Sequence, residues 1–242
     1  MIMKVLVKFP IFLAFFLLFS CDKLFTGDET AAGLKEALNV GSQFALKTLG
    51  VKDGYFLDLA VKIGLPEDAA NLVKAASNIP GLNIVVKKVA DDLVLAMNRA
   101  AEAAIEEVIP IVGKAITDMT IQDASNILFS DNKLAATDYL KNKTYTPLCD
   151  VCRDVVEPIM RQNIIGTSAL DLWNKLTGYY NDVTSLLPFV NLEPVNTNLI
   201  EYATQKGLDG VFKKIGDEEI KIRTDVNARV SDLLRKVFGR LD

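Results

Sequence analysis

Cysteines are the side chains best suited to chemistry in this sequence, because its 242 residues include three cysteines and no histidine. Two of them form a Cys-x-x-Cys motif at Cys149 and Cys152. Pro147 predicts that a helix begins just before the motif, with both sulfurs on one side of its first turns. A helix N-terminus lowers the pKa of a thiol, so a redox pair is one interpretation. A local disulfide between the two, or two small apolar core residues, are the others.

The absence of histidine excludes most familiar catalytic and metal sites. A metal at the Cys-x-x-Cys motif would need two further ligands, which neither histidine nor another unassigned cysteine supplies. The sequence also lacks the glycine motifs that bind phosphate or dinucleotides, and the nucleophile elbow of hydrolases. We therefore predict no cofactor and no metal, and an enzyme here would have to use carboxylates, lysine or tyrosine.

A second group of polar residues lies along one edge of a strongly apolar segment. Glu102 lies four residues after Asn98 and three after Arg99, so in a helix the three side chains touch on one face. Glu106 continues this edge. Two interpretations follow from this spacing. The group is either a buried carboxylate–guanidinium site that faces a cavity, or an ordinary solvated or interhelical ion pair.

The segment that carries this edge predicts a long central helix. Over residues 91–129 the apolar side chains recur in steps of three and four. They form a stripe so wide that it indicates burial on several sides. Pro110 is expected to kink this helix, and Thr120 with Asp123 resembles a capping box that opens the next one.

Similar patterns predict helices along the rest of the chain from residue 31. Ser130 and Asp131 are expected to cap one helix, and residues 188–198, with two prolines, form a loop. The segment 216–219 is expected to be a charged turn before a last helix over residues 226–237. We predict an all-α fold, a single multi-helix bundle-like domain over residues 31–242 with roughly eight to ten helices.

Residues 1–20 predict the cellular address. Two lysines precede an apolar run that is too short for a typical membrane-spanning helix, which indicates a cleaved signal peptide. The run ends in LFSC at residues 18–21, which resembles a bacterial lipoprotein signal. The resemblance implies cleavage after Ser20 and acylation of Cys21, and two or more acyl chains hold a protein firmly on a membrane. An uncleaved anchor is the alternative, and residues 21–30 are expected to be a polar, lipid-anchored tether.

The charge balance argues against nucleic acid as a partner. Removal of residues 1–20 leaves 25 basic and 31 acidic side chains, a formal net charge of −6. An acidic chain has no general attraction for nucleic acid or for anionic lipid. We therefore expect association with a membrane through the N-terminal lipid, in the cell envelope outside the cytoplasm, at either the inner or the outer membrane.

Seven short motifs, taken in their order along the chain, resemble those of the bacterial family catalogued as domain of unknown function 4197. They lie at residues 33–38, 97–102, 119–124, 135–140, 207–212, 218–223 and 234–238. The resemblance covers nearly all of the chain after the signal peptide, and it implies a secreted or lipid-anchored, mostly helical envelope protein. It assigns no catalytic residue, and the Cys-x-x-Cys motif is not among the motifs.

The polar members of these motifs define a candidate polar cluster. It consists of Asn98, Arg99, Glu102, Thr120, Asp123, Asp209, Glu218, Glu219 and Arg223. If these side chains converge in space, they form a buried network or a binding pocket. If they cap separate helices, they serve folding alone.

Three hypotheses for function follow. The first is a non-enzymatic, lipid-anchored envelope protein that acts through a protein partner or in an assembly. The second is a binding module that holds a small apolar or amphiphilic molecule between helices. The third is an enzyme that depends on carboxylates, which would require two or more acids in one cleft.

Overall fold

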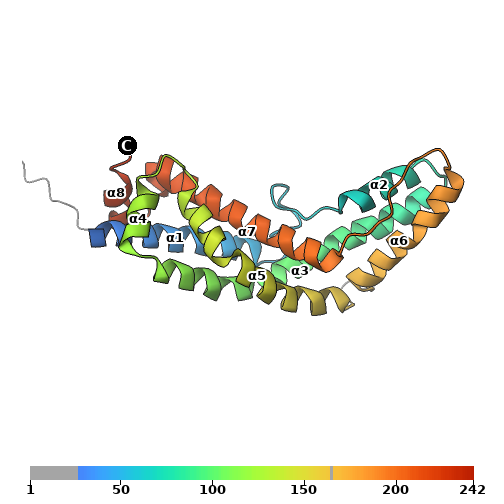
Figure 1. Cartoon of the computed structure of the whole chain (residues 1–242), viewed down its shortest axis with the longest axis horizontal. Coiled ribbons are helices and arrows are strands. Elements are labelled where there is room, and N and C mark those ends of the chain that lie inside the picture. The colour runs from blue at the N-terminus through green and yellow to red at the C-terminus, as the bar shows by residue number, and fades with distance from the viewer. Residues whose placement is uncertain (1–26, 164–165) are drawn as a thin grey trace, which may run out of the picture.

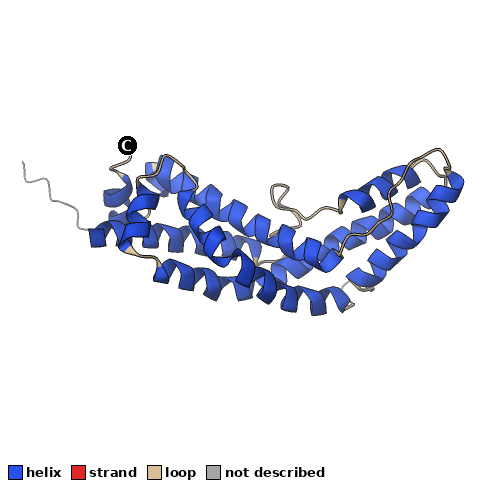
Figure 2. Ribbon diagram, in the orientation of Figure 1, coloured by secondary structure: helices blue, strands red, loops and turns tan. Residues whose placement is uncertain are grey.

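The computed structural model describes residues 27–163 and 166–242, and within them the chain folds as α-helices without strands (Figure 2). The all-α prediction is therefore confirmed. The predicted signal peptide, Cys21 and residues 21–26 of the predicted tether lie outside the described residues. The helices are α1 (Gly27–Leu49), α2 (Glu67–Ala76), α3 (Leu82–Asp118), α4 (Ile121–Leu128), α5 (Ala135–Arg161), α6 (Ala169–Leu186), α7 (Leu199–Thr224), a 3₁₀ turn η1 (Val226–Ala228) and α8 (Asp232–Phe238).

Helix α3 is the centre of the molecule, as its broad apolar stripe predicted. It packs against α1, α2, α5, α6 and α7. The molecule is an elongated, bent bundle, with α4, α8 and the start of α1 at one end and α2 and α6 at the other (Figure 1). α3 begins at Leu82 and continues through Pro110 to Asp118, and the predicted capping box of Thr120 and Asp123 then starts α4.

The predicted helix start at Pro147 is wrong, because Pro147 lies inside the single helix α5. One face of α5 is buried at intervals of four residues on both sides of the proline, at Leu140, Thr144, Leu148 and Cys152. A proline inside a helix costs about 3 kcal/mol. Burial of large apolar side chains contributes about 1.5–3 kcal/mol each, which is enough to keep the helix continuous.

The predicted charged turn at 216–219 is also wrong, since these residues lie inside α7. Their charges pair along the helix, Lys213 with Asp217 and Glu219 with Arg223. Gly216 does not form a turn. A Cβ atom at Gly216 would lie 2.9 Å from Leu134 Cδ2, so the glycine permits α7 to approach the start of α5 closely.

Three other boundaries differ from expectation. α1 begins at Gly27, so residues 27–30 belong to the helix and not to the tether. α5 begins at Ala135 with Leu134 as its N-cap residue, which makes the predicted cap at Ser130 and Asp131 wrong. The last helix begins only at Asp232, after η1. The predicted loop at 188–198 is confirmed, between α6 and α7.

None of the helices in the described ranges combines the length and the hydropathy needed to cross a membrane.

Candidate functional site: two buried polar clusters

Five of the nine candidate polar residues, together with Thr137, gather at two separate places in the bundle. The loop cluster, defined here as Asn98, Arg99 and Glu102, lies in the middle of α3. The helix-end cluster, defined as Thr137, Glu219 and Arg223, lies where α7 meets the start of α5 and the end of α4. The sequence predicted all of these residues as family-motif members, but not that they divide into two groups.

In the loop cluster, Glu102 holds the turn that follows α1. Its Oε1 accepts hydrogen bonds from the backbone N–H groups of Tyr55 and Phe56, both at 3.2 Å. Its Oε2 accepts a bond from Arg99 Nη1 at 2.5 Å, and Arg99 Nη2 donates to Asp53 Oδ1 at 2.6 Å. Asp53, in the turn that follows α1, has a φ of 70°, which is a left-handed conformation. The ion pair thus fixes a strained turn as well as two backbone donors.

Asn98 holds the other end of the same loop. Its side chain is fully buried, and its Oδ1 accepts from Ile63 N at 2.9 Å while its Nδ2 donates to Ile63 O at 2.8 Å. The amide therefore takes the place of a backbone partner for Ile63. Sequence reasoning placed Asn98 and Glu102 on a polar edge, and the structure buries both. Glu106, the fourth residue of that edge, is exposed.

The segment between these two anchors, residues 53–63, is called the clamped loop below. Its main buried residue is Tyr55, whose ring is packed beside Gly210 of α7 and whose hydroxyl donates to Gly207 O at 2.7 Å. Burial raises the pKa of Tyr55 well above its usual value. The clamped loop is thus fixed to both α3 and α7. The sequence patterns did not identify Tyr55 as a functional residue.

In the helix-end cluster, Glu219 caps a helix that has no cap of its own. The N-cap residue of α5, Leu134, has no side-chain acceptor. Glu219 reaches across from α7 and accepts from Ala136 N at 3.0 Å, Thr137 N at 2.8 Å and Thr137 Oγ1 at 2.8 Å. A carboxylate at this place satisfies free backbone donors and complements the positive end of the helix dipole.

Arg223 completes the same cluster from one turn further along α7. Its Nε donates to Glu219 Oε1 at 2.9 Å, and its two terminal nitrogens donate to the carbonyls of Ile127 and Leu128 at 2.9 and 3.1 Å. These carbonyls belong to the end of α4, the negative end of that helix dipole. The buried ion pair therefore joins the end of one helix to the start of the next, and its function in the structure is to join α4, α5 and α7.

The other candidate residues act locally. Thr120 and Asp123 form the predicted capping box, and hydrogen bonds from Thr120 lower the pKa of Asp123. Glu218 pairs with Lys221 at 2.5 Å, and Asp209 approaches Lys141 at 3.5 Å on the surface. None of these side chains joins either cluster. They fit the interpretation in which separate caps and ion pairs serve folding.

The Cys-x-x-Cys motif lies in the middle of α5, so the predicted N-terminal position of the thiols is wrong. Burial raises the pKa of the Cys149 thiol, and it raises that of Cys152 to about 12. This is the opposite of the activation that a redox thiol needs. Both cysteines are free thiols in the structure, and the predicted disulfide between them stays a prediction.

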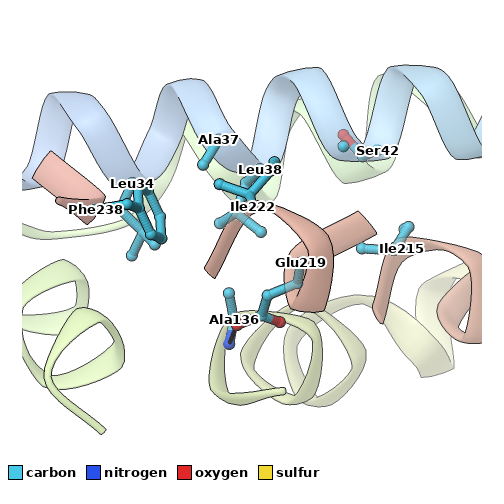
Figure 3. Close-up of a pocket in the computed structure, with 10 residues that line it drawn as sticks. Leu34, Ala37, Leu38, Ser42, Ala136, Ile215, Glu219, Ile222 and Phe238 are labelled. Atoms are coloured by element: carbon cyan, nitrogen blue, oxygen red, sulfur yellow. Dashed lines mark hydrogen bonds between the residues drawn. The ribbon is translucent and has the colours of Figure 1, made fainter. Parts of the chain in front are cut away.

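One small cavity borders the helix-end cluster. Figure 3 shows Leu34 and Leu38 of α1 facing Ile222 and Glu219 of α7 across it. Its volume is about 10 Å³, which is space for at most one water molecule. The larger hollows among the described residues, such as one of about 410 Å³ beside residues 60–64, are open surface grooves. Among the residues described, no group of three or more histidine, cysteine or acidic side chains could hold a metal ion.

Comparison with known proteins agrees with the motifs. A family model described as "Protein of unknown function (DUF4197)" matches residues 25–239, which include every helix of the described structure. No curated protein and no solved structure gave a match. The match covers most of the chain, and the chain therefore belongs to this DUF4197 family of proteins of unknown function.

Proposed function

We propose that this protein is a lipid-anchored, non-enzymatic component of the bacterial cell envelope that acts by binding a protein partner. The observation that supports this most is the use of the buried polar residues. Asn98, Glu102 and Glu219 bond to backbone groups of the protein itself, and the cavity beside Glu219 has a volume of only about 10 Å³. The hydrogen bonds of these side chains therefore maintain the fold of the protein.

The shape that the loop cluster maintains is an exposed apolar surface. Leu57 and Leu59, in the middle of the clamped loop, are 70% and 88% exposed. Lys214 pairs with Asp58 between them, and this contact lowers the pKa of Asp58. A rigid loop with two solvent-exposed leucines loses little conformational entropy when it binds, which favours a protein partner at this site.

The two rival functions receive less support. A small apolar ligand held between helices needs a cavity of a few hundred Å³, whereas the cavity between α1 and α7 beside Glu219 has about 10 Å³. An enzyme that depends on carboxylates needs at least two acids in one cleft. Glu102 and Glu219 lie in different clusters, and each is held by backbone donors.

The proposal is tested by photocrosslinking in the native envelope. A benzophenone amino acid replaces Leu59 in the clamped loop, and a second strain carries it at Ile84, which is 72% exposed on the first turn of α3. We expect one discrete protein adduct from position 59 and none of the same mass from position 84. Glu102→Gln in the position-59 strain should weaken the adduct at least tenfold because it loosens the loop.

The matched control for this variant is Glu106→Gln, one turn further along the same helix and exposed. It should leave the adduct unchanged. The proposed binding site would be contradicted if no discrete adduct formed from position 59, or if Glu102→Gln left the amount of that adduct unchanged.

A further inference from the structure

The end of the bundle where α1 begins has an unusual set of neighbours. A Cβ atom at Gly27, the first residue of α1, would lie 2.8 Å from the side chain of Ile121, the first residue of α4. Lys236 of α8 pairs with Glu29 of α1 at 2.9 Å. The start of α1, the helices α4 and α8 and the C-terminus are therefore gathered at one end of the molecule, as Figure 1 shows.

The length of the chain before Gly27 sets how far this end can lie from a membrane. Cys21 and Gly27 are six positions apart in the sequence. A fully extended chain of this length spans about 20 Å at most. This step rests on the proposed function, in which Cys21 carries the lipid. Given that lipid, the start of α1 stays within about 20 Å of the membrane surface.

Apolar side chains are exposed at the same end. Phe129, after α4, is 55% exposed, and it lines an open groove of about 500 Å³ together with Leu241. The guanidinium of Arg240 lies 5.4 Å from the centre of the Phe129 ring. Arg229 donates a hydrogen bond to Asp242, the residue after Leu241. Val230, the residue after Arg229, is 66% exposed.

We propose that this α4–α8 patch, defined as Phe129, Val230, Arg240 and Leu241, rests in the headgroup layer of the membrane that holds the Cys21 lipid. Aromatic and arginine side chains with apolar neighbours are favoured at membrane–water interfaces. The short tether brings a lipid surface, rather than a protein, next to the patch. Apolar contact carries the interaction, because the chain is acidic overall, and so we expect little dependence on salt.

The chain offers a matched control for this proposal. Phe44 of α1 is 56% exposed, almost the same as Phe129, and Lys221 lies 5.8 Å from its ring centre. It is 17 residues along α1 from Gly27, or about 25 Å. The two phenylalanines thus share exposure and a nearby cation, and they differ in distance from the tether. Phe189, in the loop after α6 at the opposite end, is 99% exposed and serves as a second control.

The experiment uses the full chain purified from its native membrane and reconstituted in phosphatidylethanolamine–phosphatidylglycerol vesicles. A benzophenone amino acid is placed singly at positions 129, 230, 44 and 189, and lipid adducts are counted by mass spectrometry. Intact mass first establishes whether Cys21 is acylated. We expect at least tenfold more lipid adduct at 129 and 230 than at 44 and 189, in low and high salt alike.

The outcomes separate the two proposals. An acylated chain with equal or absent adducts at all four positions overturns the docking of the α4–α8 patch and leaves the lipid anchor standing. A chain without acylation at Cys21 overturns both, since the tether then no longer brings this end to a membrane.

Discussion

At the scale of single residues, Glu219 illustrates how a charge is stabilised inside this bundle. The side chain is buried, and its two oxygens receive three hydrogen bonds from α5 and one from Arg223. Removal of one partner from a buried ion pair costs about 3–5 kcal/mol, because the remaining charge lies uncompensated in a poorly polarizable interior. We therefore expect Glu219→Gln to lower the free energy of unfolding by about 3 kcal/mol, measured by urea denaturation.

The neighbouring residue on α7 is the control for this prediction. Glu218 also belongs to the family motif and also forms an ion pair, with Lys221, but that lysine is mostly exposed to solvent. Surface ion pairs contribute about 0–1 kcal/mol. Glu218→Gln should therefore change stability by less than about 1 kcal/mol. Equal losses for the two variants would show that the burial of Glu219 does not decide its contribution.

The buried thiol of Cys152 gives a dependence on alkaline pH. Its pKa is about 12 in the folded protein, whereas a thiol in an unfolded chain has a pKa of about 8.5. Between these values only the unfolded chain has released the proton, so the free energy of unfolding falls as pH rises, by at most about 1.4 kcal/mol per pH unit. The stabilising contribution is fully present below pH of about 8.5.

This prediction is checked with Cys152→Ala, which has no thiol proton at this position. Between about pH 9 and 11, the free energy of unfolding of this variant should fall less steeply with pH than that of the unaltered protein. The difference between the two slopes corresponds to the release of up to one proton on unfolding. Urea denaturation at a series of pH values gives the two slopes. All other titrating groups are common to both chains, so parallel curves would mean that folding does not perturb this thiol.

At the scale of elements, glycines determine how closely the helices approach. Gly33 of α1 lies under α8, and a Cβ atom there would be 2.4 Å from Val237 Cγ2 and 2.8 Å from Val237 Cβ. Valine has little rotational freedom to move away. We expect Gly33→Ala to displace α8 and to destabilise the protein by about 1–3 kcal/mol, with faster hydrogen exchange in α8.

Gly113 of α3 is the matched control, since it is also helical and a Cβ atom there would have no neighbour within 4 Å. Alanine in an open helical position is favoured over glycine by about 0.5–1 kcal/mol, so Gly113→Ala should stabilise. If both variants destabilise equally, the contact between α1 and α8 is not the cause.

The elements also show which parts of the fold a sequence can predict. The capping box of Thr120 and Asp123 and the cap of α6 by Ser168 were predictable, because the interacting residues are only three positions apart. The cap of α5 was not, since its acceptor Glu219 lies 82 residues from Thr137. Local patterns at Pro147 and Gly216 indicated helix ends, and packing with other helices kept both helices continuous.

The candidate site shows the same division. The family motifs identified Asn98, Arg99, Glu102, Glu219 and Arg223 as a group of interest. Their partners are mostly backbone groups of distant segments, such as Ile63 for Asn98 and Leu128 for Arg223. Backbone acceptors and donors occur at every residue, so a sequence contains no signal for which of them is chosen.

At the scale of the whole molecule, the shape is the property that the helix pattern did not predict. α3 has 37 residues, which corresponds to a length of about 55 Å. Helices α1 and α4 cover one end of the bundle and α2 and α6 the other, so the molecule is long and bent (Figure 1). With the lipid at Cys21, the α2–α6 end would be held well away from the membrane, and the clamped loop lies between the two ends.

This shape predicts small-angle X-ray scattering that differs from that of a compact domain. A compact domain of about 220 residues has a radius of gyration of about 17 Å. We expect a clearly larger radius of gyration for a lipid-free chain that begins at residue 21 and carries Cys21→Ser, because mass is distributed along the full length of α3. The distance distribution should be asymmetric, with a tail beyond the length of about 55 Å of that helix.

A radius near 17 Å would mean that the two ends fold together in solution. The clamped loop would then face another part of the same chain instead of a partner, which would contradict the proposed binding site as well as the extended shape.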